Sequence, residues 1–143
     1  MSELNRAVIN AEGLILGRMA SVVAKRLLEG AYIDIVNAEG AVVSGKRKMV
    51  INERKEFLEV GGPTKGPFHY RKPNAIVRRT IRGMLPHRKP RGRDAYGRLK
   101  VHIGIPREFE GAEAESIESA KVDRLKGRYV TVGEIAENIG WKV

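Results

Sequence analysis

The positive charge of this chain is concentrated in one internal window, and that concentration is informative about its partner. Between Pro63 and Arg107 there are thirteen lysines or arginines and a single acid, Asp94. The remaining residues hold fourteen bases and sixteen acids, so the whole excess of +10 comes from this window. Lysine and arginine attract phosphates directly and release their counterions. A block this one-sided therefore favours a nucleic acid as the partner.

A solvated basic face or a disordered basic tail is the simpler alternative, because many basic runs only keep a protein soluble. Two observations oppose it. The window is internal to the chain, and it contains one segment with helical spacing of apolar residues and one with strict alternation. Charge segregation of this size within a folded segment favours nucleic-acid binding over the alternative.

One motif resembles a phosphate-binding loop. Gly40 to Lys46 nearly matches G-x-x-x-x-G-K-[ST], after a predicted strand and before a predicted helix. Arg47 replaces the hydroxyl that should hold Mg²⁺, and Ala41-Val42-Val43 is more typical of a strand. A small nucleotide hydrolase using Lys46 stays an alternative, which Mg²⁺-dependent ATP or GTP binding abolished by Lys46→Ala would support. The favoured interpretation places Lys46, Arg47 and Lys48 at a helix N-terminus that attracts an RNA phosphate.

The remaining chemistry-bearing residues do not assemble into a catalytic or metal site. His69, His87 and His102 are eighteen and fifteen residues apart, and the chain has no cysteine. No serine lies in a nucleophile-elbow sequence, and no pair of carboxylates suggests acid–base catalysis. We therefore expect no catalytic residue, no metal and no cofactor, with the histidines bonded to RNA or solvated.

Strand and helix patterns alternate along the first part of the chain. Strands are predicted at Arg6 to Asn10 and at Tyr32 to Val36, separated by a helix from Leu16 that Gly30 ends. A short apolar piece at Ala41 to Val43 precedes a second helix over Lys46 to Val60, with Val50, Phe57 and Leu58 facing inward. This order predicts an α/β sandwich whose parallel strands are joined by crossover helices.

The basic window contains the clearest helix in the sequence. Gly61 to Pro73 is rich in proline and glycine and breaks the chain. After it, apolar positions recur at i, i+3, i+4 and i+7 while three arginines fall on the opposite side, so one face can pack on a core and the other can meet phosphate. The first set is Val77, Thr80, Ile81 and Met84, and the second is Arg78, Arg79 and Arg82.

The segment after this helix is predicted to be extended. Pro86 to Arg98 consists mainly of proline, glycine and bases, so we expect a loop that orders only on RNA, threading Arg88, Lys89, Arg91 and Arg93 along it. Leu99 to Ile105 then alternates strictly and predicts a strand with one buried face.

The C-terminal part has a different character. Glu108 to Glu118 is acidic and predicted to be a surface connection, and Tyr129 to Val132 a short strand. Thr131 and Glu134 have the spacing of a capping box, so a helix is expected to start there and to end at Gly140, with Trp141 anchoring the tail. No apolar run approaches the ~20 residues of a membrane span, and residues 1–143 are expected to form one domain.

Several stretches resemble the universal large-subunit ribosomal protein family L-thirteen. The most specific are Lys65 to Pro73 and Arg79 to His87, with Arg82-Gly-Met-Leu-Pro86 as the family signature. The long form with Gly66-Pro67 and His87 is similar to the archaeal and eukaryotic branch, most of all the archaeal. Agreement extends over nearly the whole chain except residues 108–126, where the family varies. Further matching stretches are Leu16 to Ser21, Val36 to Glu39, Ser44 to Lys46, Arg98 to Val101, Gly104 to Pro106 and Gly140 to Lys142.

The resemblance implies a three-layer α/β/α sandwich on a small, mainly parallel, four-stranded sheet that carries a basic arm, residues 63–107. It implies a non-catalytic, cytoplasmic protein that binds large-subunit ribosomal RNA beside neighbouring ribosomal proteins and acts early in subunit assembly. Neither a membrane nor a small-molecule substrate is expected as a partner. A regulator that binds RNA away from the ribosome stays open, because the same basic surface would serve both roles.

The residues predicted to contact RNA carry a cation or an imidazole and lie in the basic window or at the helix start before it. They are Lys46, Arg47, Lys48, Lys65, His69, Arg71, Lys72, Arg78, Arg79, Arg82, His87, Arg88, Lys89, Arg91, Arg93 and Arg98.

Overall fold

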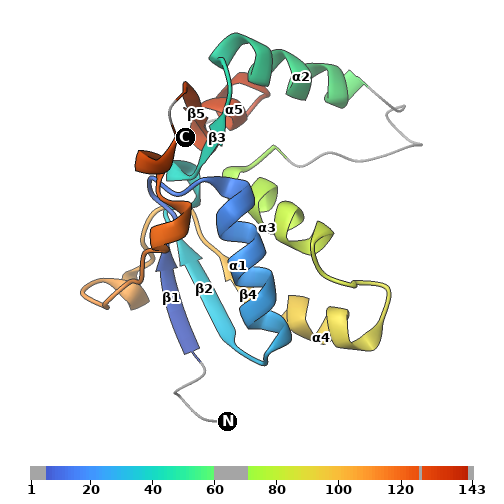
Figure 1. The fold of residues 1–143 in the computed structure, drawn as a ribbon, viewed down its shortest axis with the longest axis vertical. Coiled ribbons are helices and arrows are strands. Elements are labelled where there is room, and N and C mark those ends of the chain that lie inside the picture. Colours follow the sequence, from blue (N-terminus) through green and yellow to red (C-terminus); the bar gives the residue numbers. More distant parts are fainter. Residues whose placement is uncertain (1–5, 60–70, 126, 142–143) are drawn as a thin grey trace.

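The computed structural model describes residues 6–59, 71–125 and 127–141. The predicted break in the chain from Gly61 to Pro73 falls largely outside these residues. Lys65 and His69, which are predicted to contact RNA, lie in the part that is not described. Figure 1 shows the helices and strands of the described residues, which are joined by loops and short 3₁₀ turns. The elements are β1 (Arg6–Asn10), α1 (Leu16–Leu28), β2 (Tyr32–Val36), η2 (Ala38–Gly40), β3 (Val42–Ser44), α2 (Arg47–Glu59), α3 (Pro73–Gly83), α4 (Pro90–Gly97), β4 (Leu99–Val101), η3 (Arg107–Phe109), η4 (Glu118–Ala120), η5 (Val122–Arg124), β5 (Tyr129–Thr131) and α5 (Val132–Asn138).

The main sheet is parallel and has three strands, in the order β1-β2-β4. The expected fourth strand is wrong: β3 pairs antiparallel with β5 in a separate two-stranded sheet. Only five residues join β2 to β3, whereas a parallel crossover needs a dozen or more. At the other edge of the main sheet a single bridge joins Glu115 to Ile9.

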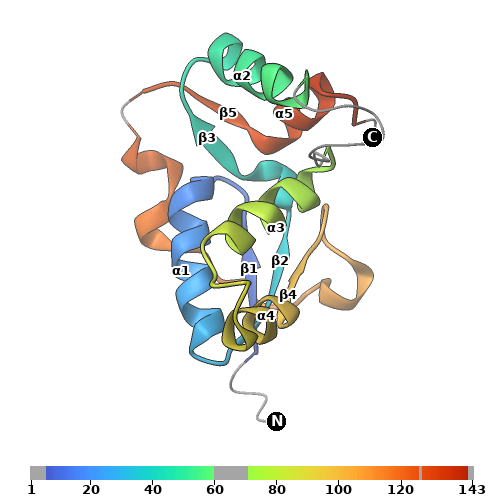
Figure 2. The same ribbon diagram turned by 90° about the vertical axis from the view of Figure 1, so that its right-hand side faces the viewer.

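One face of the main sheet forms the core. Ile9, Ile35 and Val101 lie side by side in register, and they are buried together with the apolar stripes of α1 and α3. Figure 2 shows both helices on this side of the sheet. The predicted crossover of β1, α1 and β2 is therefore confirmed, whereas the second helical layer of an α/β/α sandwich is not.

Helix α1 ends as its sequence predicts. Gly30 has a φ of +104°, its N–H donates to the Leu27 carbonyl at 3.0 Å, and the Ala31 N–H donates to the Arg26 carbonyl at 3.1 Å. These two bonds form a Schellman motif, which needs a left-handed residue at this position and so favours glycine.

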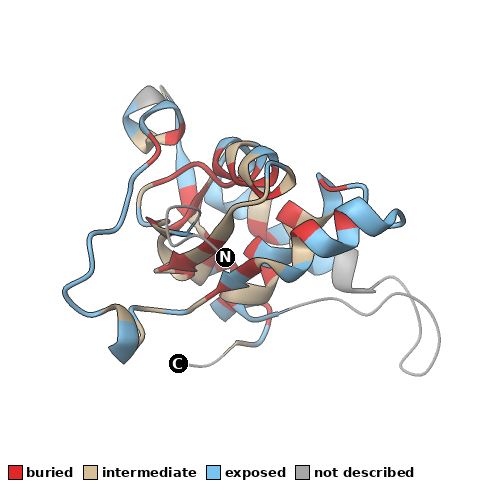
Figure 3. Ribbon diagram, turned by 90° about the horizontal axis from the view of Figure 1, so that it is seen from below, coloured by how far each residue is buried: buried red, intermediate tan, exposed pale blue. Residues whose placement is uncertain are grey.

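Strand β4 is shorter than the alternation predicts. It ends at Val101, and Ile103 and Ile105 are 38% and 51% exposed, so the expected strand to Ile105 is wrong. The chain turns because its next polar groups bond to the loop after β2. The His102 carbonyl accepts the N–H of Ala38, and the Gly104 N–H donates to the carboxylate of Glu39. The connection then runs through η3 with most residues exposed, which Figure 3 shows from below.

The segment predicted as an extended loop contains α4 instead. Pro90 occupies the first turn of this helix, where proline needs no hydrogen-bond donor. Gly92 and Ala95 are buried and Tyr96 is half-buried, at i, i+3 and i+4. The buried side of α4 thus consists of small residues that a search for apolar periodicity overlooks, although the spacing is helical.

Helices α2 and α3 match their predicted ranges closely but not every inward residue. Met84 lies beyond α3 and is 43% exposed, while Ile76, which the pattern omitted, is buried. On α2, Ile51 is buried and Val50 is half-buried; the side chains of Phe57 and Leu58 fall outside the described residues. None of the described helices combines the length and the apolar composition that a membrane crossing needs.

Helix α5 begins at the predicted capping box. The Thr131 hydroxyl accepts the Glu134 N–H at 3.2 Å. Replacing Thr131 with alanine leaves this N–H without its partner, so we expect the free energy of unfolding to fall by about 1 kcal/mol. Urea denaturation followed by circular dichroism measures the change. Thr131→Ser keeps the acceptor and should unfold close to wild type; equal losses for both variants would contradict the capping role.

Candidate nucleic-acid interface

Helices α3 and α4 and the turn between them place seven of the sixteen predicted RNA-contacting residues on one side of the molecule. Between residues 71 and 98 there are ten lysines or arginines and one acid, Asp94. Figure 2 looks onto the two helices, which follow one another along this side. We name as the α3–α4 surface the exposed residues Arg78, Arg79, Arg88, Lys89, Arg91 and Arg93, with the half-buried Arg82 at its inner edge.

The apolar side of each helix fixes this surface to the body. Ile76, Val77 and Ile81 of α3 are buried in the core, so the arginines between them must point outward. Helix α4 packs so closely on the turn before it that a Cβ at Gly92 would overlap the Pro86 carbonyl. The cations are thus carried by a folded scaffold that packs on the core.

An arginine–aromatic contact joins the two helices. The guanidinium carbon of Arg78 lies 4.3 Å from the centre of the Tyr96 ring, a distance typical of a cation–π interaction. Arg78 is itself exposed, so its guanidinium group is also accessible to solvent. Tyr96 was absent from the predicted site, because its role depends on α4 being a helix.

Removing the Tyr96 ring should loosen α4. We expect Tyr96→Leu to lower the free energy of unfolding by about 1 kcal/mol, since the cation–π contact and part of the packing are lost. Hydrogen exchange at the α4 amides should rise more than exchange in α1. Tyr96→Phe keeps an aromatic face and should lie near wild type. If Tyr96→Phe exchanged as fast as Tyr96→Leu, the ring would not be the feature that holds α4.

The turn between the helices is bonded to α4. Arg93 Nη1 donates to the Arg88 carbonyl at 3.1 Å, and the His87 N–H donates to the Leu85 carbonyl at 2.8 Å. The Nδ1 atom of half-buried His87 is itself buried. His87 therefore lies within the turn rather than at the outer surface.

Two predicted contact residues have structural partners. Arg98 Nη2 donates to the Leu27 carbonyl at 2.6 Å, which places a cation at the C-terminal end of α1. A Cβ at Gly140 would lie 3.1 Å from Arg71 Nη1, so the Arg71 side chain reaches over the end of α5. Lys72 precedes α3 and is exposed.

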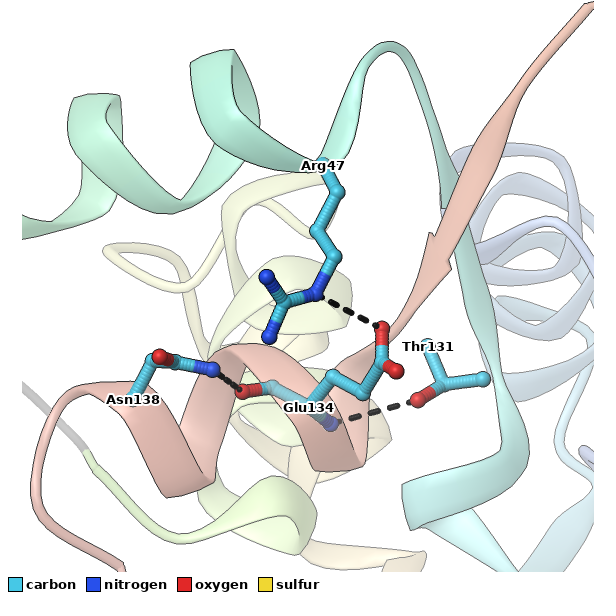
Figure 4. A network of polar contacts seen from close by, with 4 residues as sticks. All are labelled: Arg47, Thr131, Glu134 and Asn138. Atoms are coloured by element: carbon cyan, nitrogen blue, oxygen red, sulfur yellow. Dashed lines mark hydrogen bonds and ion pairs between the residues drawn. The ribbon is translucent and has the colours of Figure 1, made fainter.

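Lys46, Arg47 and Lys48 lie at the start of α2, at the opposite end of the molecule from α4 (Figure 1). Arg47 is turned toward α5, where its Nε lies 3.8 Å from Glu134 Oε2 (Figure 4). Lys46 lines a surface pocket of about 390 Å³ together with Gly45 and Arg128. The structure therefore does not bring these three residues together with the α3–α4 surface.

The backbone from Gly40 to Gly45 does not form a phosphate cradle. The N–H groups of Gly40, Ala41 and Val42 donate to the carbonyls of Asn37, Ala38 and Leu14, and that of Gly45 donates to Arg128. Val43 and Ser44 belong to β3 and pair with β5. A phosphate loop needs free N–H groups aimed at the ligand, so this stretch does not have the geometry of a phosphate loop.

His102 is apart from the α3–α4 surface and has a polar partner. Its Nε2 lies 3.0 Å from Asp34 Oδ1, and its ring lies 5.5 Å from the Phe109 ring. Among the described residues no three acidic, histidine or cysteine side chains gather closely enough to hold a metal ion. The candidate site therefore consists of cations on two helices and the turn between them.

Comparison with known proteins identifies close relatives. The family profile described as ribosomal protein L13 matches residues 5–108. "Large ribosomal subunit protein uL13" of Methanococcoides burtonii is 48% identical over 94% of this chain and 98% of its own length. The proteins of the same description from Archaeoglobus fulgidus and Saccharolobus solfataricus are 47% and 46% identical, over 94% of this chain and 88% and 92% of their own lengths.

Proposed function

Because this chain belongs to the ribosomal protein L13 family, we propose that it is a structural component of the large ribosomal subunit. It binds large-subunit ribosomal RNA, and the α3–α4 surface makes the main contact. The observation that carries the proposal is the clustering of exposed cations on two packed helices with Asp94 as the only acid between residues 71 and 98.

The mode of binding follows from what the surface contains. Each guanidinium group can donate two parallel hydrogen bonds to one phosphate. Such contacts fix the orientation of the protein on the RNA without reading the base sequence. Tyr96 is the only aromatic residue between positions 71 and 98, and Arg78 covers one side of its ring. Recognition therefore depends on the shape and backbone of folded RNA, as it does for most structured RNA targets.

The family is structural and not enzymatic, and the paired backbone amides of residues 40–45 agree with this role. The neighbours of this protein are other large-subunit proteins, and it acts in the cytoplasm, on the ribosome. Binding early in assembly fits a surface that is folded before RNA arrives, because little ordering entropy opposes the first contact. No cofactor or small-molecule substrate takes part.

Sedimentation of a native lysate tests the proposal. The chain should move with the large subunit in a sucrose gradient, remain there after a high-salt wash, and leave it after ribonuclease digestion. A chain found at the top of the gradient in low salt would refute the ribosomal role. Release by high salt alone, with the subunit intact, would reduce the role to that of a loosely bound factor.

A further inference from the structure

The face of the main sheet opposite the core carries a second group of cations around an aromatic ring. Arg6 pairs with Tyr32 across β1 and β2, and Lys100 pairs with Asp34 across β2 and β4. Because side chains alternate along a strand, these four residues share one face. Arg6 and Lys100 are exposed, and Tyr32 and Asp34 are half-buried.

Near the N-terminal ends of its strands, this face of the sheet is accessible to solvent. A surface pocket of about 140 Å³ is lined by Arg6, Tyr32, Asp34, Gly97, Arg98 and Lys100. Of the described segments, the connection after β4 contacts the upper part of the face, where His102 meets Asp34. That bond occupies the single acid of the pocket, so the charge of the remaining lining is positive.

The tyrosine ring and the cations on either side of it could stack on an unpaired base and bind its phosphates. The Arg6 guanidinium carbon lies 5.6 Å from the Tyr32 ring centre, so one side of the ring already has a planar cation beside it. Arg6 and Lys100 lie on the two strands that flank β2 and are offset by two residues, so their backbones are about 12 Å apart. Proteins that bind single strands combine an aromatic stacking position with flanking positive charge in this way.

We propose that this pocket binds an unpaired RNA segment, with one base stacked on Tyr32 and the adjoining phosphates held by Arg6 and Lys100. A paired base cannot use the site, because its π-face is covered within the duplex. The α4 helix ends at Gly97, which lines the pocket, so the site lies beside the C-terminal end of α4. The inference rests on the proposed RNA-binding function and adds a second, single-strand contact to it.

Proton NMR on the full chain tests the stacking directly. The probe is a short RNA of alternating adenine and cytosine, which cannot pair with itself. Stacking should shift the Tyr32 ring signals upfield, while those of Tyr129, which is 50% exposed on β5, should not move. Unmoved Tyr32 signals at saturating RNA would overturn the proposal. The same shift produced by a glutamate-rich peptide would also overturn it, because the pocket would then be an acidic-peptide site.

Variants give the matching affinity test. Tyr32→Val keeps a residue that favours strands and should weaken binding of this RNA by about tenfold, while Tyr32→Phe should bind like wild type. Tyr129→Val is the control for replacing a tyrosine on a strand. If Tyr32→Val bound normally while neutralising the α3–α4 surface abolished binding of folded RNA, the pocket would be wrong and the proposed function would stand.

Discussion

Neutralising four cations of the α3–α4 surface will remove most of the RNA affinity. We choose Arg79, Arg88, Lys89 and Arg91, because all are exposed and their replacement with glutamine leaves the Arg78–Tyr96 contact and the Arg93–Arg88 carbonyl bond in place. Each lost phosphate contact lowers the slope of log K against log salt by about 0.9. The slope should thus fall by about three to four units, and binding at about 0.1 M salt should weaken on the order of a thousandfold.

Filter binding of large-subunit RNA over a series of salt concentrations measures both quantities. The control replaces four exposed bases elsewhere, Arg18, Lys25, Lys55 and Arg107, so that its net charge equals that of the test variant. The slope of log K against log salt should be at least three units steeper for this control than for the test variant. Equal slopes for the two would mean that net charge alone, and not the α3–α4 surface, determines binding.

Gly92→Ala will disrupt α4 although alanine is the better helix former. The added Cβ would overlap the backbone carbonyl of Pro86 and lie 2.9 Å from the His87 nitrogen. Backbone atoms cannot move aside as a flexible side chain can, so overpacking should cost about 3 kcal/mol, more than the roughly 1 kcal/mol that alanine contributes in a helix. We expect α4 to separate from the turn, and RNA affinity to fall with it.

Gly97→Ala is the matched control for this substitution. Gly97 also lies in α4, and no atom lies within 4 Å of a Cβ added there. This variant should be as stable as wild type or slightly more stable by thermal unfolding. If Gly92→Ala were as stable as wild type and bound RNA as tightly, the close packing of α4 on residues 86 and 87 would be disproved.

The parts predicted correctly have local causes. The periodicity of α1, the glycine at its end and the Thr131–Glu134 box each act within one or two turns of chain, and each forms as predicted. The outward arginines of α3 follow from the same spacing, since Val77 and Ile81 fix the inner side. Local patterns therefore predict the part of the α3–α4 surface that lies on α3.

The parts that failed depend on contacts distant in sequence. Gly92 and Ala95 carry too little apolar area to mark a helix, and their burial depends on the packing of α4 against residues 86 and 87 and against the distant helix α1. Strand β4 stops at Val101 because the next residues bond to the loop after β2. Likewise, the sequence grouped Lys46 and Arg47 with the α3–α4 arginines only by charge, but the start of α2 lies at the opposite end of the molecule from α4.

Crosslinking within native large subunits tests the central claim most directly. Irradiation with ultraviolet light joins protein to RNA where they touch, and mass spectrometry of the digested protein identifies the peptides that carry a nucleotide. We predict crosslinks in peptides covering residues 71–98 and none in the acidic segment 108–118. Crosslinks confined to other parts of the chain, with residues 71–98 unmodified, would contradict the assignment of the α3–α4 surface as the RNA contact.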